Sequence, residues 1–387
     1  MTTILIFLLV LTVLVLIHEF GHYFAARLFG VKAEEFGWGF PPRAIGFVRV
    51  NGKWKRVSAD DKTEYANTVW SLNWFPLGGF VRLKGEEGVN ADDKDSFASK
   101  KSWQRLIIIA AGVIMNWLLA AAIISFSFAV GVPAQVDESL AGANVRDPKI
   151  QIADVLAESP AATAGIQPGD FLVAVNGVNV AKSEAARQSL GELSKEGTTL
   201  PITVERADKL LTLETHPALL KELGRPGLGV SLVDTAIVRF PIHLAIYRGF
   251  VTTGLYTKLI LTGLYDLVHD LLVQREVTAP VSGPIGIAVM TGRIAKQGFW
   301  NMMQFTALLS LNLAVINFFP IPALDGGRAV FIALEWIRRR RVKASFEATL
   351  HKIGFLVLMA LVVLVTIRDV RQYGGVIWTG IKHMVGL

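Results

Sequence analysis

The sequence contains no cysteine. This absence excludes disulfide bonds, thiolate metal ligands and a cysteine nucleophile, so a metal ion would have to be bound by histidine, aspartate or glutamate. Histidine is scarce as well: there are seven in the chain, and only His18 and His22 stand four positions apart. A metal site built on histidine therefore has one clear starting point.

Charged residues are also few, at 18% of 387 residues, while 52% are apolar. This balance is too apolar for an ordinary soluble enzyme and too charged for a fully buried bundle, so it indicates membrane spans combined with water-facing parts. The formal charge of +7 comes from basic residues gathered in particular loops. This distribution favours membrane topology over nucleic-acid binding, and no nucleic-acid-binding motif is present.

Four apolar runs predict four transmembrane helices. They cover about 3–28, 106–130, 303–319 and 353–367, and the last needs flanking residues to reach the roughly 20 that cross a bilayer. A signal peptide is the alternative for the first run. That run lacks a basic beginning and a small-residue cleavage site. Its second half also carries His18, Glu19 and His22, which a cleaved signal peptide would remove from the protein. We therefore expect a retained span.

Basic residues orient these spans. Lysine and arginine are concentrated between the first two spans and again between the last two, where Arg338–Arg341 form a run. The positive-inside rule then predicts that both segments are cytoplasmic, with both termini and residues 131–300 on the opposite side. The apolar segment 240–275 is interrupted by four charged residues, which favours an amphipathic helix on the membrane surface. If this segment spans instead, the topology after it inverts.

A water-facing domain is predicted between the second span and this segment. Alternating residues at Phe171–Val175 and Leu200–Val204 indicate strands, and turn residues such as Asn176-Gly177 separate them. The stretch Ser159–Gly177 resembles PDZ domains, and the resemblance covers 136–234. It implies a module that adds a peptide strand to a sheet edge. A rigid spacer or gate is the equally open alternative.

The residues His18-Glu19-Phe20-Gly21-His22 form a His-Glu-x-x-His motif. Positions i and i+4 lie on one face of a helix, so two neutral imidazoles can bind one zinc ion. Glu19 can reach the metal-bound water and accept its proton as a general base. Ionisable residues within an apolar span are costly and usually functional, so we predict zinc ligands at His18 and His22.

A third ligand is predicted at Asp325. Directly after the third apolar run, Pro320 and Pro322 break the helix, and Gly326-Gly327 free the backbone beside this aspartate. A catalytic zinc site needs three protein ligands and an open position, and a carboxylate at the end of a broken span suits this role. The alternative is a loop whose aspartate only caps a helix.

The two motifs together resemble the site-2 protease family of intramembrane zinc metalloproteases, in particular its bacterial RseP-like branch. That family pairs His-Glu-x-x-His with Asn-x-x-Pro-x-Pro-x-Leu-Asp-Gly, met here from Asn317 to Gly326. The resemblance covers nearly the whole chain and implies His18, His22 and Asp325 as Zn2+ ligands and Glu19 as the base. It suggests that Asn317 contacts the substrate backbone or oxyanion. This chain has one PDZ-like segment where some members have two.

The stretch Phe75–Glu86 resembles the membrane-associated β-hairpin of that branch, and the segment 69–84 is predicted to supply a strand edge for the substrate. We predict that its edge residues Gly79, Phe80 and Val81 pair with an unwound substrate strand. A hairpin without substrate contact is the alternative.

The fold class predicted is a mainly α membrane protein: four transmembrane helices, a membrane-associated β-hairpin and an inserted α+β PDZ domain. The expected divisions are 1–135 with the first two spans, 136–234 as the PDZ domain, 235–300 as surface helix and linker, and 301–387 with the last two spans. The resemblance implies a multi-pass protein of the cell inner membrane whose active site lies toward the cytoplasm.

The resemblance implies that the function is intramembrane cleavage of single-span membrane proteins, such as trimmed anti-sigma factors or remnant signal peptides, after an upstream site-1 protease has cut the same substrate. The lipid bilayer is the expected environment, with no nucleic acid as a partner. One alternative is a membrane-anchored zinc peptidase that acts on soluble or surface segments. The other is a non-enzymatic adaptor.

Overall fold

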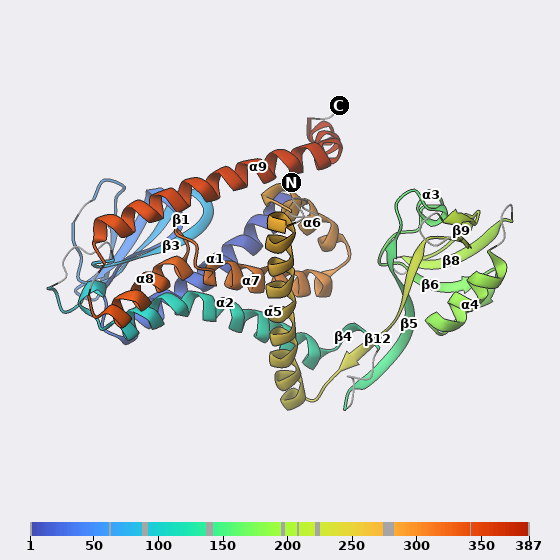
Figure 1. The fold of residues 1–387 in the computed structure, drawn as a ribbon, viewed down its shortest axis with the longest axis horizontal. Coiled ribbons are helices and arrows are strands. Elements are labelled where there is room, and N and C mark those ends of the chain that lie inside the picture. The colour runs from blue at the N-terminus through green and yellow to red at the C-terminus, as the bar shows by residue number, and fades with distance from the viewer. Residues whose placement is uncertain are drawn as a thin grey trace. The chain divides into compact units, whose positions relative to one another are not determined.

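The structure, a computed structural model, describes residues 2–61, 63–86, 92–136, 142–194, 198–206, 209–220, 225–273, 282–340 and 342–385. It divides into two compact units, each described here by itself (Figure 1). The first unit comprises Met1–Ile124 and Phe250–Leu387, and the second comprises Ser125–Gly249. The four-part division expected from the sequence stays a prediction.

Long apolar helices dominate the first unit. Within the described residues, four helices are long and apolar enough to cross a membrane, which confirms that part of the prediction. They are α1 (Thr2–Leu28), α2 (Ser102–Val130), α7 (Phe299–Phe318) and α9 (Ala344–Val385). The candidate span in α9 covers Ser345–Gln372 and is longer than the predicted 353–367, because the helix continues through the mixed residues on both sides.

Three further described helices lie wholly or mainly in this unit: α5 (Ile242–Val273), whose first residues belong to the second unit, α6 (Pro284–Lys296) and α8 (Asp325–Arg338). Helix α5 confirms the helix expected at 240–275 as far as residue 273, and the last two residues lie outside the described part. Its place on the membrane surface stays a prediction. The buried carboxylate of Asp369 in α9 accepts hydrogen bonds from the N–H groups of Gly283 (3.2 Å) and Gly286 (2.7 Å), which fastens the start of α6 to α9.

A three-stranded sheet follows α1, with β1 (Ala33–Val50) between β2 (Lys53–Val57) and β3 (Val69–Leu83). Both long strands bend. As a result, Glu35–Trp38 of β1 pair with Val69–Leu72 and also with Gly79–Arg82. The predicted hairpin at 69–84 is therefore corrected: its two halves do not pair with each other, because the start of β1 lies between them. The second half of β3 is left as an edge. A short 3-10 helix (Phe97–Ser99) precedes α2.

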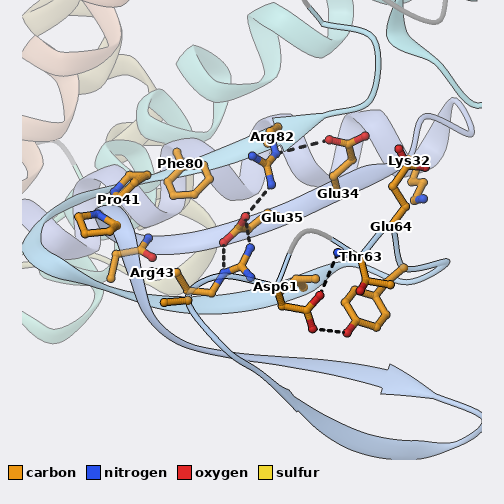
Figure 2. A pocket seen from close by; sticks show the side chains of 15 residues that line it. Lys32, Glu34, Glu35, Pro41, Arg43, Asp61, Thr63, Glu64, Phe80 and Arg82 are labelled. Atoms are coloured by element: carbon orange, nitrogen blue, oxygen red, sulfur yellow. Dashed lines mark hydrogen bonds and ion pairs between the residues drawn. The ribbon is translucent and has the colours of Figure 1, made fainter.

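A buried carboxylate fixes this sheet. The side chain of Glu35 accepts two hydrogen bonds from Arg43 (2.8 and 2.6 Å) and one from Arg82 (2.7 Å), at the wall of a pocket of about 470 Å3 (Figure 2). Burial raises the pKa of Glu35, but the hydrogen bonds from Arg43 and Ser71 and the charge of Arg82 outweigh it and hold this pKa below its ordinary value. The carboxylate thus ties β3 to both parts of the bent strand β1.

The second unit is built around a sheet with the order β4-β12-β5-β6-β8-β9, in which β7 pairs with β6, and a separate pair β10-β11. The strands are β4 (Val132–Gln135), β5 (Asn144–Val155), β6 (Phe171–Val175), β7 (Val178–Asn179), β8 (Leu200–Arg206), β9 (Lys209–Thr215), β10 (Ala218–Leu220), β11 (Arg225–Gly227) and β12 (Val230–Arg239). Its helices are α3 (Pro160–Thr163) and α4 (Ser183–Leu193). Strands β6 and β8 confirm the alternation in the sequence, since Leu172, Ile202 and Val204 are in the core.

Candidate metal centre

The two motif histidines lie one turn apart in α1 and are both buried. The Nδ1 atom of His22 is 2.9 Å from the carbonyl oxygen of Ile108 in α2. A carbonyl can only accept, so Nδ1 carries the proton and the lone pair of Nε2 is available to a metal ion. The spacing of four residues therefore places both histidines on one face of α1. The carbonyl oxygen of Ile108 in α2 fixes the tautomer of His22.

His18 is oriented by a residue that the sequence analysis did not single out. The buried side-chain amide of Asn116 in α2 lies 3.5 Å from His18 Nδ1. Within the part of the chain that the structure describes, the Oδ1 atom of Asn116 has no hydrogen-bond partner. The oxygen and nitrogen of an amide are nearly isosteric, so the side chain of Asn116 can be turned over to place Oδ1 beside His18. Oδ1 then accepts a hydrogen bond from the Nδ1–H of His18, and the lone pair of Nε2 is available to a metal ion. The only signal in the sequence was a polar residue inside an apolar run.

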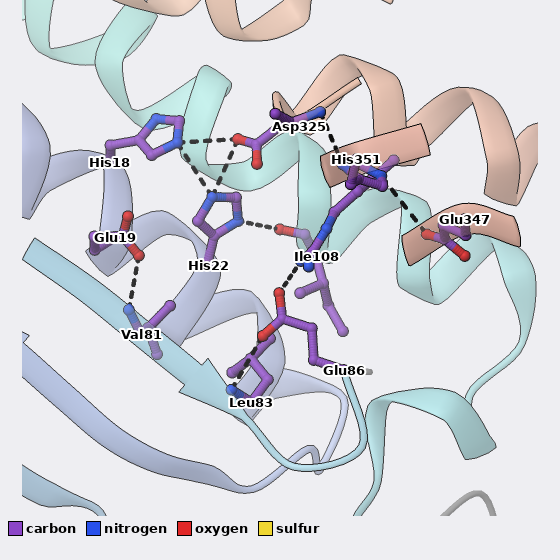
Figure 3. A network of polar contacts seen from close by, with 12 residues as sticks. His18, Glu19, His22, Val81, Leu83, Glu86, Ile108, Asp325, Glu347 and His351 are labelled. Atoms are coloured by element: carbon purple, nitrogen blue, oxygen red, sulfur yellow. Dashed lines mark hydrogen bonds and ion pairs between the residues drawn. The ribbon is translucent and has the colours of Figure 1, made fainter. Parts of the chain in front are cut away.

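Asp325, the first residue of α8, meets both histidines (Figure 3). Its Oδ2 atom is 3.0 Å from Nε2 of His18 and 3.2 Å from Nε2 of His22, and the two Nε2 atoms are 3.2 Å apart. Residues from both ends of the chain thus form one cluster.

The close packing of the start of α8 on the preceding residues depends on two glycines. A Cβ atom at Gly326 would collide with the carbonyl groups of Phe318 and Phe319, and one at Gly327 with the carbonyl of Ile321. The start of α8 therefore packs directly on the end of α7 and the loop that follows it. The predicted substrate contact Asn317 also reaches the cluster, with its Nδ2 atom 3.4 Å from Nε2 of His18.

Two further glycines bring α1 against α2. A Cβ atom at Gly21 would collide with the carbonyl of Ala111, and one at Gly112 would collide with the rings of His22 and His18. The absence of a side chain at Gly112 therefore leaves room at the ring nitrogens. This residue was also missed, and a glycine within an apolar helix is the signal that marks it.

The cluster fits a zinc ion. The ligand atoms of His18, His22 and Asp325 all lie within 4.8 Å of one another, and Oδ2 of Asp325 is buried without a hydrogen bond that satisfies it. Bonds of 2.0–2.2 Å in a tetrahedral site separate neighbouring ligand atoms by about 3.3 Å, close to the distances seen here. Two imidazoles and one carboxylate also form a donor set typical of catalytic zinc.

Glu19 does not belong to this set of three, because its carboxylate points to the edge of the sheet. Its Oε2 atom accepts a hydrogen bond of 2.9 Å from the backbone N–H of Val81 (Figure 3). Of the other predicted edge residues, Phe80 pairs with Gly37 of β1, and Gly79 lies against Leu16 of α1. The predicted base and the predicted substrate edge are therefore in direct contact.

A half-buried ion pair connects the same edge to α8. Arg328 pairs with Glu86, and Glu86 also accepts a hydrogen bond of 3.4 Å from the N–H of Leu83, the last residue of β3. Burial lowers the pKa of Arg328, but the nearby charge of Glu86 outweighs it and raises this pKa. The edge of the sheet is thus fastened both to α1 and to the helix that begins with Asp325.

Comparison with known families agrees with this geometry. The model of "Peptidase family M50" matches residues 6–59 and 60–361. The chain belongs to peptidase family M50. This is the site-2 protease family that the sequence motifs resemble. The matched residues contain all three members of the metal cluster, as well as Glu19 and Asn317.

Relatives match this M50 peptidase over almost their whole length. "Putative zinc metalloprotease Atu1380" of Agrobacterium fabrum (strain C58) is 30% identical over 393 residues, which cover 95% of this chain and 96% of that protein. "Regulator of sigma-W protease RasP" of Bacillus subtilis (strain 168) is 28% identical over 435 residues, with 96% and 98% covered. Among solved structures, the PDZ domain of an SdrC-like protein from Listeria monocytogenes matches with 22% identity and a TM-score of 0.21, covering 23% of this chain and 92% of that one.

Proposed function

We propose that this M50 peptidase is a zinc metalloprotease that hydrolyses peptide bonds within the transmembrane segments of single-span membrane proteins. The observation that carries the proposal is the convergence of His18, His22 and Asp325 on one point, with two of these residues inside a helix apolar enough to cross a membrane. The names of the two relatives, a zinc metalloprotease and a sigma-W regulator protease, support the same activity.

His18, His22 and Asp325 would hold the zinc ion, and zinc supplies an acidified water and polarisation of the scissile carbonyl. Glu19 takes the proton from the attacking water and later returns it to the leaving amine. The N–H of Val81 fixes one carboxylate oxygen of Glu19, so the other oxygen keeps a constant direction for this transfer. Asn317, beside His18, is the proposed donor to the substrate carbonyl or backbone.

The edge of β3 is the proposed binding site for the substrate. A peptide bond in a helix is protected by its own hydrogen bonds, so the substrate must unwind before water can reach the carbonyl. An unwound segment can pair with a free strand edge. Gly79, Phe80 and Val81 belong to the half of β3 that pairs with β1 on one side only, and this edge leads directly to Glu19.

The cellular setting proposed is the inner membrane, with the active site toward the cytoplasm and both termini and the inserted PDZ-like domain on the other side. That domain would exclude substrates with large outer domains. Trimmed anti-sigma factors or remnant signal peptides, released by an upstream protease, are the proposed substrate class. The name of RasP supports a role in regulated proteolysis.

Purified protein in detergent tests this proposal. Zinc content and cleavage of a single-span model substrate would be measured for the wild type, Glu19→Gln and Asp325→Ala. We expect the wild type to bind zinc and cleave, Glu19→Gln to retain zinc without cleaving, and Asp325→Ala to lose both. Full zinc and full activity in Asp325→Ala would refute the third ligand, and cleavage by Glu19→Gln would refute the mechanism.

A further inference from the structure

The loop that presents Asp325 contains a strained residue. Ala323 has a φ of +82°, in a region that residues with a side chain rarely adopt. It lies only two positions before Asp325, and Leu324 between them has an extended backbone. A change of φ at Ala323 would therefore reorient the start of α8. Neighbouring groups must stabilise this conformation, because it is unfavourable in isolation.

A side chain of the last long helix supplies such a group. The backbone N–H of Ala323 donates a hydrogen bond of 2.8 Å to Nδ1 of His351 in α9 (Figure 3). The N–H can only donate, so Nδ1 is the unprotonated nitrogen and the proton is on Nε2. Among the described residues, Nε2 is buried without a hydrogen-bond partner, and it lies 3.9 Å from the carboxylate of Glu347. The single strong polar contact of this ring is therefore the one with the strained loop.

Helix α9 touches the same loop at a second point. A Cβ atom at Gly354 would collide with the carbonyl oxygen of Pro322. His351 and Gly354 are three positions apart and therefore share one face of α9. The ring of His351 also lies 5.9 Å from that of Phe331 in α8. One face of α9 thus covers both the loop and the helix that carry Asp325.

We propose that His351 is a positioning residue for the metal centre, which holds Asp325 in place through the backbone of Ala323. The inference rests on the proposed zinc site. Without an acceptor at Nδ1, the N–H of Ala323 would lose its partner, and the loop would relax toward ordinary negative φ. The carboxylate of Asp325 would then leave the position that it shares with the two imidazoles.

Two substitutions separate the acceptor from the shape of the ring. His351→Phe keeps a ring and removes the acceptor, while His351→Asn loses the ring and keeps an oxygen near the place of Nδ1. His269→Leu, in α5, is the control for loss of a partly exposed histidine from a helix. Size-exclusion profile and melting temperature would report the fold. The readouts are the zinc affinity against a chromogenic chelator, the visible spectrum of the Co2+-substituted protein, and kcat and KM for the model substrate.

We expect His351→Phe to weaken zinc binding or to lower kcat by about 10–100-fold, which is typical for residues that orient metal ligands. The spectrum of the Co2+-substituted variant should shift, and KM should not change. His351→Asn should recover most of the loss, and the control should match the wild type. Equal losses in both His351 variants, or none in either, would overturn the inference. A larger loss in His351→Asn would do the same. A wild type that neither binds zinc nor cleaves would refute the proposed function instead.

Discussion

The N–H of Val81 donates a hydrogen bond of 2.9 Å to the carboxylate of Glu19. Val81 belongs to the edge half of β3, and Glu19 lies between the two histidines of α1. The donor faces away from β1, in the direction from which a further strand would approach. One contact thus links the proposed base to the proposed substrate edge, so a change at the edge should alter proton transfer as well as substrate binding.

Val81→Pro should lower the cleavage rate by at least about 10-fold while zinc content stays at the wild-type level. Proline lacks the N–H that holds Glu19 and that a strand edge requires. The matched control is Val81→Ala, which shortens the side chain and keeps the N–H. Cleavage of the single-span substrate and bound zinc would be measured side by side. Wild-type turnover in the proline variant would contradict both roles of this edge.

Gly112→Ala should weaken zinc binding by about 10-fold or more, because the added methyl group would meet the ring nitrogen of His22. Gly254 in α5 offers a matched control, since a Cβ atom there meets nothing within 4 Å. Zinc affinity would be measured by chelator competition at constant pH. If both alanine variants bind zinc equally well, the open space at Gly112 is not needed for the metal.

Asn116→Leu should also weaken zinc binding, by about 10–100-fold, because the Nδ1 proton of His18 loses its proposed acceptor and the tautomer is no longer fixed. Asn312 in α7 is half-buried, and its side chain donates a hydrogen bond of 3.0 Å to the carbonyl oxygen of Leu308 in its own helix, so Asn312→Leu serves as the control. The Co2+-substituted spectrum would reveal a changed ligand field. An unchanged spectrum and affinity in the Asn116 variant would exclude this role.

The ion pairs of Glu35 should make the stability of the sheet depend on pH. The pKa of Glu35 is lowered on folding. Its contribution to the free energy of unfolding is therefore fully present above the unfolded pKa near 4.5, and it is lost as the pH falls through the lower pKa of the folded state. Glu35→Gln leaves the guanidinium of Arg43, whose side chain is 12% exposed, without its carboxylate partner. We expect this to lower the free energy of unfolding by about 3 kcal/mol near pH 7.

Melting temperatures of the wild type and Glu35→Gln, measured from pH 7 down to pH 3, would test this. The difference between them should shrink below about pH 4.5. Glu34→Gln is the control, because Glu34 meets the exposed side chain of Arg82 at 3.4 Å and such a pair contributes little. A difference that stays constant over the whole range would contradict the assignment.

The sequence was most informative where the chemistry is local. His18 and His22 share one face of α1 because of helix geometry alone. The prolines and glycines around Asp325 predict the helix break after α7. Asn116, Gly112 and His351 could not be assigned in this way. Their roles depend on contacts between helices far apart in sequence, and neither periodicity nor spacing encodes which residue of α2 or α9 lies opposite the metal site.

The sheet shows the same limit. Alternation and the Gly78-Gly79 pair predicted an extended segment with a turn at 69–84, and Gly78 does have a positive φ of +73°. The pairing was wrong, because Glu35–Trp38 enter between the two halves of β3. Strand partners are set by long-range register, and a single segment carries no information about which strand will lie beside it.

The distance along the chain between the two parts of the metal cluster has a consequence for biosynthesis. The ribosome makes His18 and His22 before the inserted domain and Asp325 only after it. Until then the two imidazoles lack the carboxylate of Asp325. The incomplete chain therefore cannot assemble the proposed three-ligand site while the inserted domain is being made, so that domain is complete before the proposed site can hold zinc.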